Sequence, residues 1–213
     1  MSLPEERRAG LVTLGTVLAA MVLVLTALLA GSEPAAGEIS VFEAVNGLPD
    51  VPAALWWPVM QLGSLVGTVL VAAGFALFRH RRLATAYATA TVAAWLGAQL
   101  LKVIVDRGRP ADFALDAIMR GSAASGQGFP SGHAAVALAA AFVVSAGHGR
   151  PWSYVALTLA GVVATARLYV GAHLPLDVVG GGAAGVVVGL VASHLILRLR
   201  SERLGGMAGT PAE

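Results

Sequence analysis

Long apolar stretches separated by short polar segments dominate the chain. A helix needs about 20 predominantly apolar residues to cross the hydrocarbon core of a bilayer. Stretches of this kind predict six transmembrane helices, at about residues 11–30, 53–78, 83–105, 132–146, 154–169 and 175–197. We therefore expect an all-α polytopic membrane protein, with one membrane-embedded domain covering residues 1–213.

The first apolar stretch has two possible interpretations. Arg7 and Arg8 precede it and small residues follow it, which is also the arrangement of a secretory signal peptide. The apolar region of such a signal is usually about 7–15 residues long. Residues 11–30 form a longer run, so a retained transmembrane helix is favoured.

The polar segment between the first two spans contains a weak helical signal. Residues 31–52 are acidic and broken by proline and glycine, yet Ile39, Phe42 and Val45 recur at every third position. Such spacing places the three side chains on one face of a helix. It predicts a short helix lying in the membrane interface before the second span.

Composition supports the membrane assignment and excludes several function classes. Hydrophobic residues make up 57% and charged residues 12%, about half the charged fraction of a typical soluble domain. The absence of cysteine from the sequence excludes disulfides and thiolate nucleophiles or metal ligands. A net charge of +2 without a basic cluster argues against nucleic acid as a partner.

The distribution of basic residues predicts the orientation. Six spans place both termini on one side, and that side carries Arg7, Arg8, Arg79, Arg81, Arg82, Arg150, Arg198, Arg200 and Arg203. The positive-inside rule makes this side cytoplasmic, in a cell (inner or plasma) membrane. The opposite, outer side carries Lys102, Arg107, Arg109, Arg120 and Arg167. Basic residues there oppose the insertion bias, and charges at the ends of apolar helices are functional by default.

Three short motifs contain most of the polar chemistry. They are Lys102 with Arg109-Pro110, the run Pro130-Ser131-Gly132-His133, and Arg167 with His173 and Asp177. The expected topology brings all three to the outer ends of the third to sixth spans. The sequence therefore predicts a single site at the outer face.

The residue types in these motifs suit a phosphate group. Guanidinium groups bind phosphate oxygens through two parallel hydrogen bonds, and Lys adds a point charge. Ser131 and Gly132 would open the fourth span, where free backbone N–H groups bind anions. Ser131 could instead act only as a helix cap.

His173 and Asp177 are four residues apart, so they share a face if a helix begins near His173. The carboxylate would then orient the imidazole as a nucleophile, and His133 would be available as a general acid. Asp177 could alternatively pair with Arg167. Two histidines and one carboxylate among three cations make a poor divalent site, so we expect no metal cofactor.

In this order and spacing the motifs resemble the signature of the type 2 phosphatidic acid phosphatase family, K-x6-RP, PSGH and SR-x5-H-x3-D. One position departs from it, because Ala166 stands where the family usually has Ser. The resemblance implies attack by His173, protonation of the leaving group by His133, and a phosphohistidine that water hydrolyses without a metal. It also implies phosphate binding by Lys102, Arg109, Ser131, Gly132 and Arg167. Arg107 lies outside the strict pattern and is a candidate auxiliary.

The leading functional hypothesis is a phosphatase acting on a lipid in the bilayer. Candidate substrates are a polyprenyl diphosphate such as undecaprenyl diphosphate, phosphatidic acid or phosphatidylglycerol phosphate. Three alternatives remain. A lipid phosphotransferase would use the same site, and a vanadate-dependent haloperoxidase has a similar oxyanion site. A transporter or scaffold would not need both histidines together with the carboxylate. Gly181, Gly185 and Gly189 recur at four-residue spacing and predict close helix packing, either internal or in a homodimer.

Overall fold

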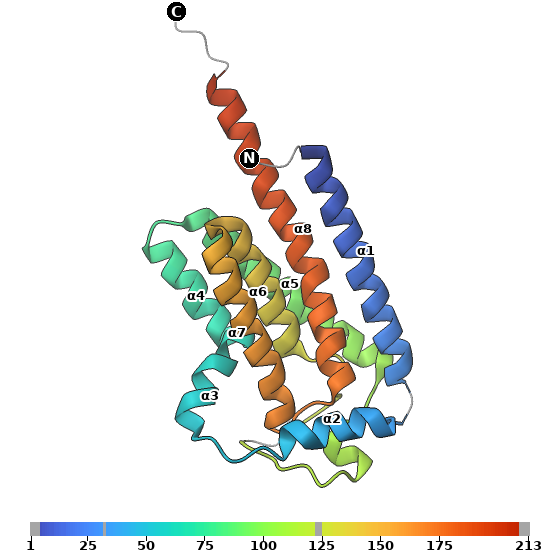
Figure 1. The fold of residues 1–213 in the computed structure, drawn as a ribbon. Helices are drawn as coiled ribbons and strands as arrows, with labels where there is room; N and C mark the ends of the chain where they lie inside the picture. Colours follow the sequence, from blue (N-terminus) through green and yellow to red (C-terminus); the bar gives the residue numbers. More distant parts are fainter. Residues whose placement is uncertain (1–4, 32, 122–124, 209–213) are drawn as a thin grey trace, which may run out of the picture.

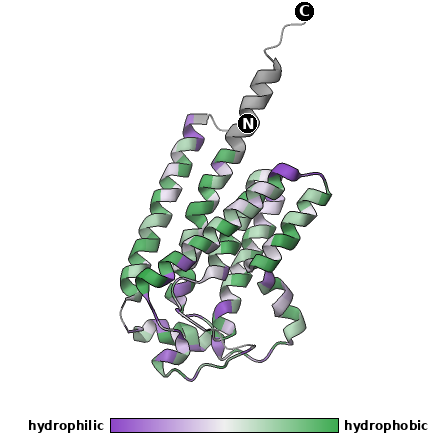
Figure 2. Cartoon of the chain, turned by 180° about the vertical axis from the view of Figure 1, so that it is seen from behind, coloured by the Kyte–Doolittle hydropathy of each residue, from purple (hydrophilic) through white to green (hydrophobic). Residues whose placement is uncertain are grey.

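The fold is that of a computed structural model, which describes residues 5–31, 33–121 and 125–208. The side chains of residue 5 and of residues 196–208 are outside this description, including those of Arg198, Arg200 and Arg203 that entered the orientation argument. Helices account for all regular structure in the described residues, so the expected all-α class is confirmed. Apolar residues dominate the long helices, and hydrophilic residues gather in the connections (Figure 2).

The α-helices in chain order are α1 (Glu5–Ala30), α2 (Ala36–Asn46), α3 (Ala53–Met60), α4 (Leu65–Leu77), α5 (Arg81–Val105), α6 (Gly132–His148), α7 (Arg150–Tyr169) and α8 (Pro175–Ala208). Two short 3-10 helices are η1 (Gln61–Gly63) and η2 (Pro110–Phe113). Helix α2 is the short helix expected before the second span. It lies across the end of the bundle, below α1 and α8 in the view of Figure 1.

Among the residues that the structure describes, three stretches are long and apolar enough to cross a membrane by themselves: Glu6–Ala30, Arg81–Phe113 and Pro175–Leu195. A fourth is possible if α3–η1 and α4 form one bent span. Helix α6 is apolar but has only 17 residues. The polytopic architecture is therefore confirmed, whereas the count of six spans stays a prediction.

The stretch 53–78, expected as one continuous span, is broken instead. Helices α3–η1 and α4 meet at an angle of 76°, and Ser64 between them has an extended backbone. The Ser64 Oγ accepts a hydrogen bond from the Gly67 N–H at 3.0 Å, which caps the start of α4. The break was not predicted because hydropathy measures only how apolar a stretch is and carries no information on a hydrogen bond from a capping side chain.

Helix α6 is the centre of the bundle and packs against α5, α7 and α8, while α1 packs on α8 and α4 on α5. Small residues permit this close packing. A Cβ on Gly185 or Gly189 would collide with the backbone or a side-chain Cβ of α6. A Cβ on Gly181 would meet Ser131 immediately before α6. The glycine face of α8 is thus used within the chain.

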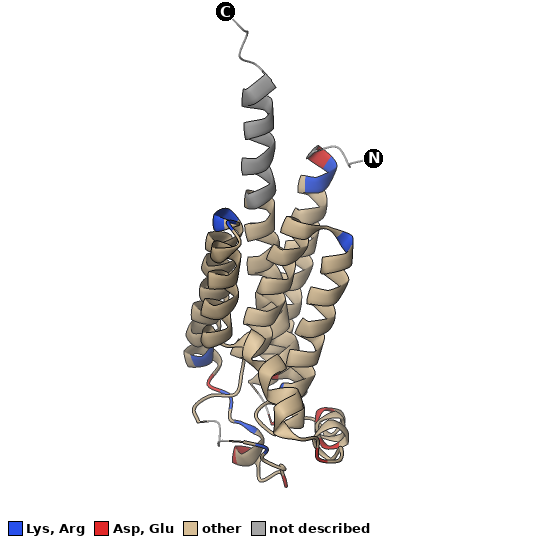
Figure 3. Cartoon of the chain, turned by 90° about the vertical axis from the view of Figure 1, so that its left-hand side faces the viewer, with Lys and Arg blue, Asp and Glu red and all other residues tan. Residues whose placement is uncertain are grey.

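The polar connections lie at the two ends of the bundle. The start of α1 and the α4–α5 and α6–α7 turns are at one end, and α2, the α5–α6 segment and the α7–α8 turn are at the other (Figure 1). Charged residues concentrate at both ends and are sparse between them (Figure 3). The end that carries α2 also carries all three sequence motifs.

Candidate active site at the end of the bundle

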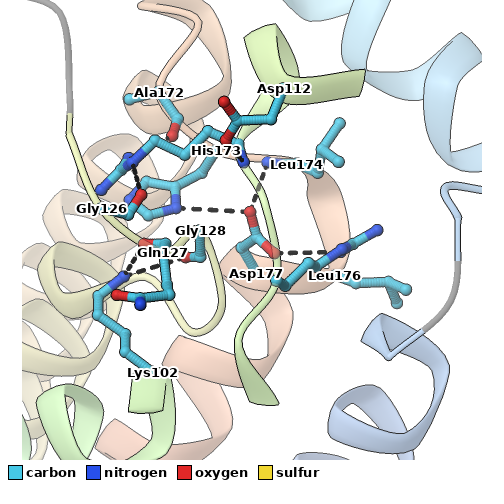
Figure 4. Close-up of polar contacts among 12 residues, drawn as sticks. Lys102, Asp112, Gly126, Gln127, Gly128, Ala172, His173, Leu174, Leu176 and Asp177 are labelled. Atoms are coloured by element: carbon cyan, nitrogen blue, oxygen red, sulfur yellow. Dashed lines mark hydrogen bonds and ion pairs between the residues drawn. The ribbon is translucent and has the colours of Figure 1, made fainter.

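His173 lies in the turn between α7 and α8 and is 3% exposed. Gly171 makes this turn possible with φ +77°, a conformation that residues with a Cβ rarely adopt. The His173 Nδ1 is 3.5 Å from Asp177 Oδ2, at the outer limit of a hydrogen bond (Figure 4). The same oxygen accepts the Leu174 N–H at 2.9 Å. The structure therefore brings together the pair expected from the four-residue spacing.

Burial, together with the charges of Arg167 and Arg109, lowers the pKa of His173 from 6.5 to about 4. The Asp177 carboxylate opposes this shift but does not reverse it. His173 is therefore neutral at physiological pH. Only the neutral imidazole has a free nitrogen lone pair, which a nucleophile requires.

Asp177 is fully buried and pairs with Arg107 rather than with Arg167. The Arg107 Nη1 is 3.1 Å from Asp177 Oδ1, and the Arg107 Nη2 is 2.7 Å from Glu38 Oε2. Arg107, an auxiliary candidate in the sequence, thus has a direct contact with the His173 partner.

Sequence reasoning missed Glu38 as part of this site. Glu38 lies in the first turn of α2 and shares its buried face with Phe42 and Asn46. The positions are four residues apart, so the signal was a carboxylate on the face of α2 that packs against the protein. A charged residue on a buried helix face needs a partner.

Lys102, at the end of α5, and Arg109, in the segment after it, lie at the same end of the bundle as His173. Both side chains donate hydrogen bonds to backbone carbonyl groups. The Lys102 Nζ donates to the carbonyls of Gln127 and Gly128 at 2.6 and 3.2 Å (Figure 4). The Arg109 guanidinium donates to the carbonyls of Ser125, Gly126 and Ala172, the last at 2.7 Å. Lys has three donors and Arg five, so each side chain retains donors beyond these contacts.

Ser131 and Gly132 lie at the start of α6, as expected. Ser131 is fully buried and occupies the N-cap position, yet its side chain makes no capping hydrogen bond. Its Oγ has no hydrogen-bond partner among the described protein atoms. The Ser131 N–H donates to the Asp177 carbonyl at 2.8 Å, which ties the start of α6 to α8. A purely capping role for the hydroxyl is therefore contradicted.

His133 and Arg167 complete the cluster. His133 is on the first turn of α6, within electrostatic range of Arg167, His173, Arg109 and Lys102. Arg167 is 8% exposed in the last turn of α7, and its Nη1 contacts the Met60 sulfur at 3.0 Å. The Arg167 Nε has no acceptor within the described part of the chain. Buried donors of this kind are what an anionic ligand requires.

An apolar cavity of about 270 Å³ lies within the bundle, and no side chain of this cluster lines it. It lies between α4, α5, α6 and α7, and its lining includes Leu62, Tyr87, Ala137, Ala141, Trp152 and Val163. Ala137 is one helical turn beyond His133 on α6, and His148, eleven residues further on, lines the far end. At about 1.5 Å per residue the cavity follows α6 for about 16 Å. No cluster of three metal-ligating side chains occurs in residues 5–31, 33–121 and 125–208.

The fold and the site define an all-helical membrane protein with a buried His-Asp pair inside a group of cationic side chains. The sequence pattern of the PAP2 superfamily matches residues 83–201, more than half of the chain, which contains all three motifs. The chain belongs to the PAP2 superfamily. The family suggested by the motifs is therefore confirmed.

Two solved structures share the fold. The first transmembrane PAP2-type phosphatidylglycerolphosphate phosphatase from Bacillus subtilis is 19% identical, with a TM-score of 0.72 over 86% of this chain and 96% of that protein. LpxE from Aquifex aeolicus is 24% identical, with a TM-score of 0.68 over 75% of this chain and 96% of that protein. No curated protein sequence matches the chain.

Proposed function

We propose that this protein is a lipid phosphatase that removes phosphate from a lipid phosphate or diphosphate in the bilayer. The observation that carries the proposal is the buried His173–Asp177 pair among Lys102, Arg109 and Arg167. These cations suit an anionic group that accumulates charge on its equatorial oxygens in the transition state. The apolar cavity, whose lining on α6 begins at Ala137, one turn beyond His133, supports a substrate with a hydrocarbon tail.

The chemistry follows from the positions of the two histidines. The His173 Nε2 attacks phosphorus while the bond from phosphorus to the lipid oxygen breaks. His133 donates its proton to that oxygen, and a phosphohistidine forms. Water, deprotonated by His133, then attacks phosphorus, and the P–N bond breaks to release inorganic phosphate. Lys102, Arg109, Arg167, the Ser131 hydroxyl and the Gly132 N–H bind the phosphoryl oxygens, without a metal in any step.

We propose an undecaprenyl-type polyprenyl diphosphate or a phosphatidyl phosphate as the substrate. The phosphatidylglycerolphosphate phosphatase of similar fold supports the second class. The basic residues at the opposite end of the bundle support an outward-facing site with cytoplasmic termini. A substrate headgroup would then reach the site from the outer leaflet while its tail stayed in the bilayer.

The direct test is phosphate release by purified protein, without added metal, from prenyl diphosphates, phosphatidic acid, phosphatidylglycerol phosphate and soluble esters. We expect release from at least one lipid, loss of release in His173→Ala, and an acid-labile phosphorylated enzyme that His173→Ala does not form. His194→Ala, a change on α8 outside the site, should behave like the wild type. Unchanged release by His173→Ala would contradict the proposal, and transfer to an added alcohol in place of water would indicate a phosphotransferase.

A further inference from the structure

Arg107 is the centre of a buried ionic chain that runs from α2 to the His173 turn. Its guanidinium contacts Glu38 at 2.7 and 3.0 Å through two nitrogens and Asp177 at 3.1 Å. The side chains of Arg107, Glu38 and Asp177 are 1%, 6% and 0% exposed. Three charged groups are thus removed from solvent immediately behind His173.

Such an arrangement is a costly way to stabilise a fold. Removing an ion from water is energetically costly, and packed apolar side chains of similar volume often stabilise a protein as well or better. Stability alone therefore does not account for the triad. The location of the triad indicates another role. Within the described part of the chain, Asp177 contacts His173, and Arg107 and Glu38 lie behind Asp177.

Both carboxylates also hold the backbone around His173. Asp177 Oδ2 accepts the Leu174 N–H at 2.9 Å, and Glu38 Oε1 accepts the Leu176 N–H at 2.9 Å. These two N–H groups are at the start of α8, directly after His173. Helix α2 is thereby tied to the turn that carries the nucleophile.

We propose that Glu38 and Arg107 are positioning residues for His173, an inference that rests on the proposed function. Arg107 fixes one Asp177 oxygen, so that the other faces the imidazole Nδ1. The positive charge of Arg107 by itself would weaken the attraction of Asp177 for a cationic imidazole. Glu38 compensates that charge and leaves one net negative charge behind His173, where the phosphohistidine step makes the imidazole cationic.

The test compares Glu38→Gln with Glu43→Gln, an exposed carboxylate on the same helix. Partners that orient a reacting side chain typically contribute about 10–100-fold. We expect folded Glu38→Gln to have a kcat about tenfold lower with KM within about twofold, while Glu43→Gln changes neither constant. A wild-type kcat in folded Glu38→Gln, or an effect confined to KM, would overturn the inference.

A second variant covers the possibility that an unpaired Arg107 prevents folding. The double change Glu38→Leu with Arg107→Met removes one negative and one positive charge, so the net charge behind His173 stays that of Asp177, and apolar packing becomes possible. If the pair only neutralises buried charge, this variant regains wild-type kcat, and the inference is overturned. If the pair positions His173, the variant folds but kcat stays at least tenfold low. An inactive wild type would contradict the proposed function instead, so the two failures are distinguishable.

Discussion

The Nδ1 of His173 and the Oδ2 of Asp177 are 3.5 Å apart, and both side chains are almost fully buried. Arg107 holds the other carboxylate oxygen, Oδ1, and the Leu174 N–H donates to Oδ2 itself, so the carboxylate cannot turn away from the imidazole. Contacts of this type are often long without substrate and shorten in the transition state. This relationship makes the carboxylate a defined target for substitution.

Asp177→Asn should lower kcat far more than it changes KM. The amide preserves shape but removes the charge that stabilises a cationic imidazole, and it permits the wrong tautomer. The corresponding change in a Ser-His-Asp triad costs about 10⁴-fold in kcat. Steady-state phosphate release measures the effect. Asp116→Asn, at an exposed position in the α5–α6 segment, is the matched control and should be neutral. Equal activity of the two variants would exclude an orienting role for Asp177.

The pKa of His173 predicts a specific pH dependence of stability. Burial lowers it to about 4 in the folded protein, below the ordinary 6.5. The unfolded chain therefore binds more protons between these values, and the folded state loses stability as pH falls from 6.5 towards 4. Thermal unfolding at pH 7, 5.5 and 4 should show a smaller loss for His173→Gln than for the wild type. An equal loss of stability in the wild type and in His173→Gln would show that His173 has an ordinary pKa in the folded protein.

Ser131→Ala separates catalysis from helix capping. Because the hydroxyl makes no capping bond, its removal should leave the thermal midpoint unchanged. A hydroxyl that donates to the phosphoryl oxygen in the transition state is worth about 100-fold or more in kcat. A loss of about 1 kcal/mol of stability with full activity would instead be the result of losing a cap.

Ala156→Phe tests the apolar cavity as the site of the lipid tail. Ala156 is on α7, lines the cavity and is partly exposed, so a larger side chain would occupy the cavity. We expect KM for a long-chain lipid substrate to rise several-fold while kcat/KM for a short soluble ester stays constant. Ala93→Phe, on an exposed position of α5 that does not line the cavity, is the control. Equal effects on lipid and soluble substrates would rule out tail binding there.

Gly181 and Gly182 are adjacent on α8 but differ in surroundings. A Cβ at Gly181 would collide with the Ser131 backbone, whereas one at Gly182 would lie 4.0 Å from Leu138. Gly181→Ala should therefore destabilise the protein by about 1–3 kcal/mol and displace the start of α6. Gly182→Ala should be neutral or stabilising by up to about 1 kcal/mol. Thermal unfolding and phosphate release measure both; a stable, fully active Gly181→Ala would show that α8 can shift.

Much of this protein was determined by local sequence. Apolar runs predicted the helical membrane class, since the length needed to cross hydrocarbon does not depend on tertiary contacts. The spacing of His173 and Asp177 predicted their pairing, although His173 lies in the turn two residues before α8 begins. The three motifs also indicated the family to which the chain belongs.

Only the tertiary structure decided the partners of those residues. Asp177 pairs with Arg107 and not Arg167, and Glu38 joins them from a helix about 70 residues earlier, because packing rather than spacing brings their elements together. The break at Ser64 likewise depends on one side-chain hydrogen bond that an apolar run does not reveal. Periodicity reports which face of an element is apolar. Which charged groups meet behind His173 follows from how α2, the α5–α6 segment and α8 converge.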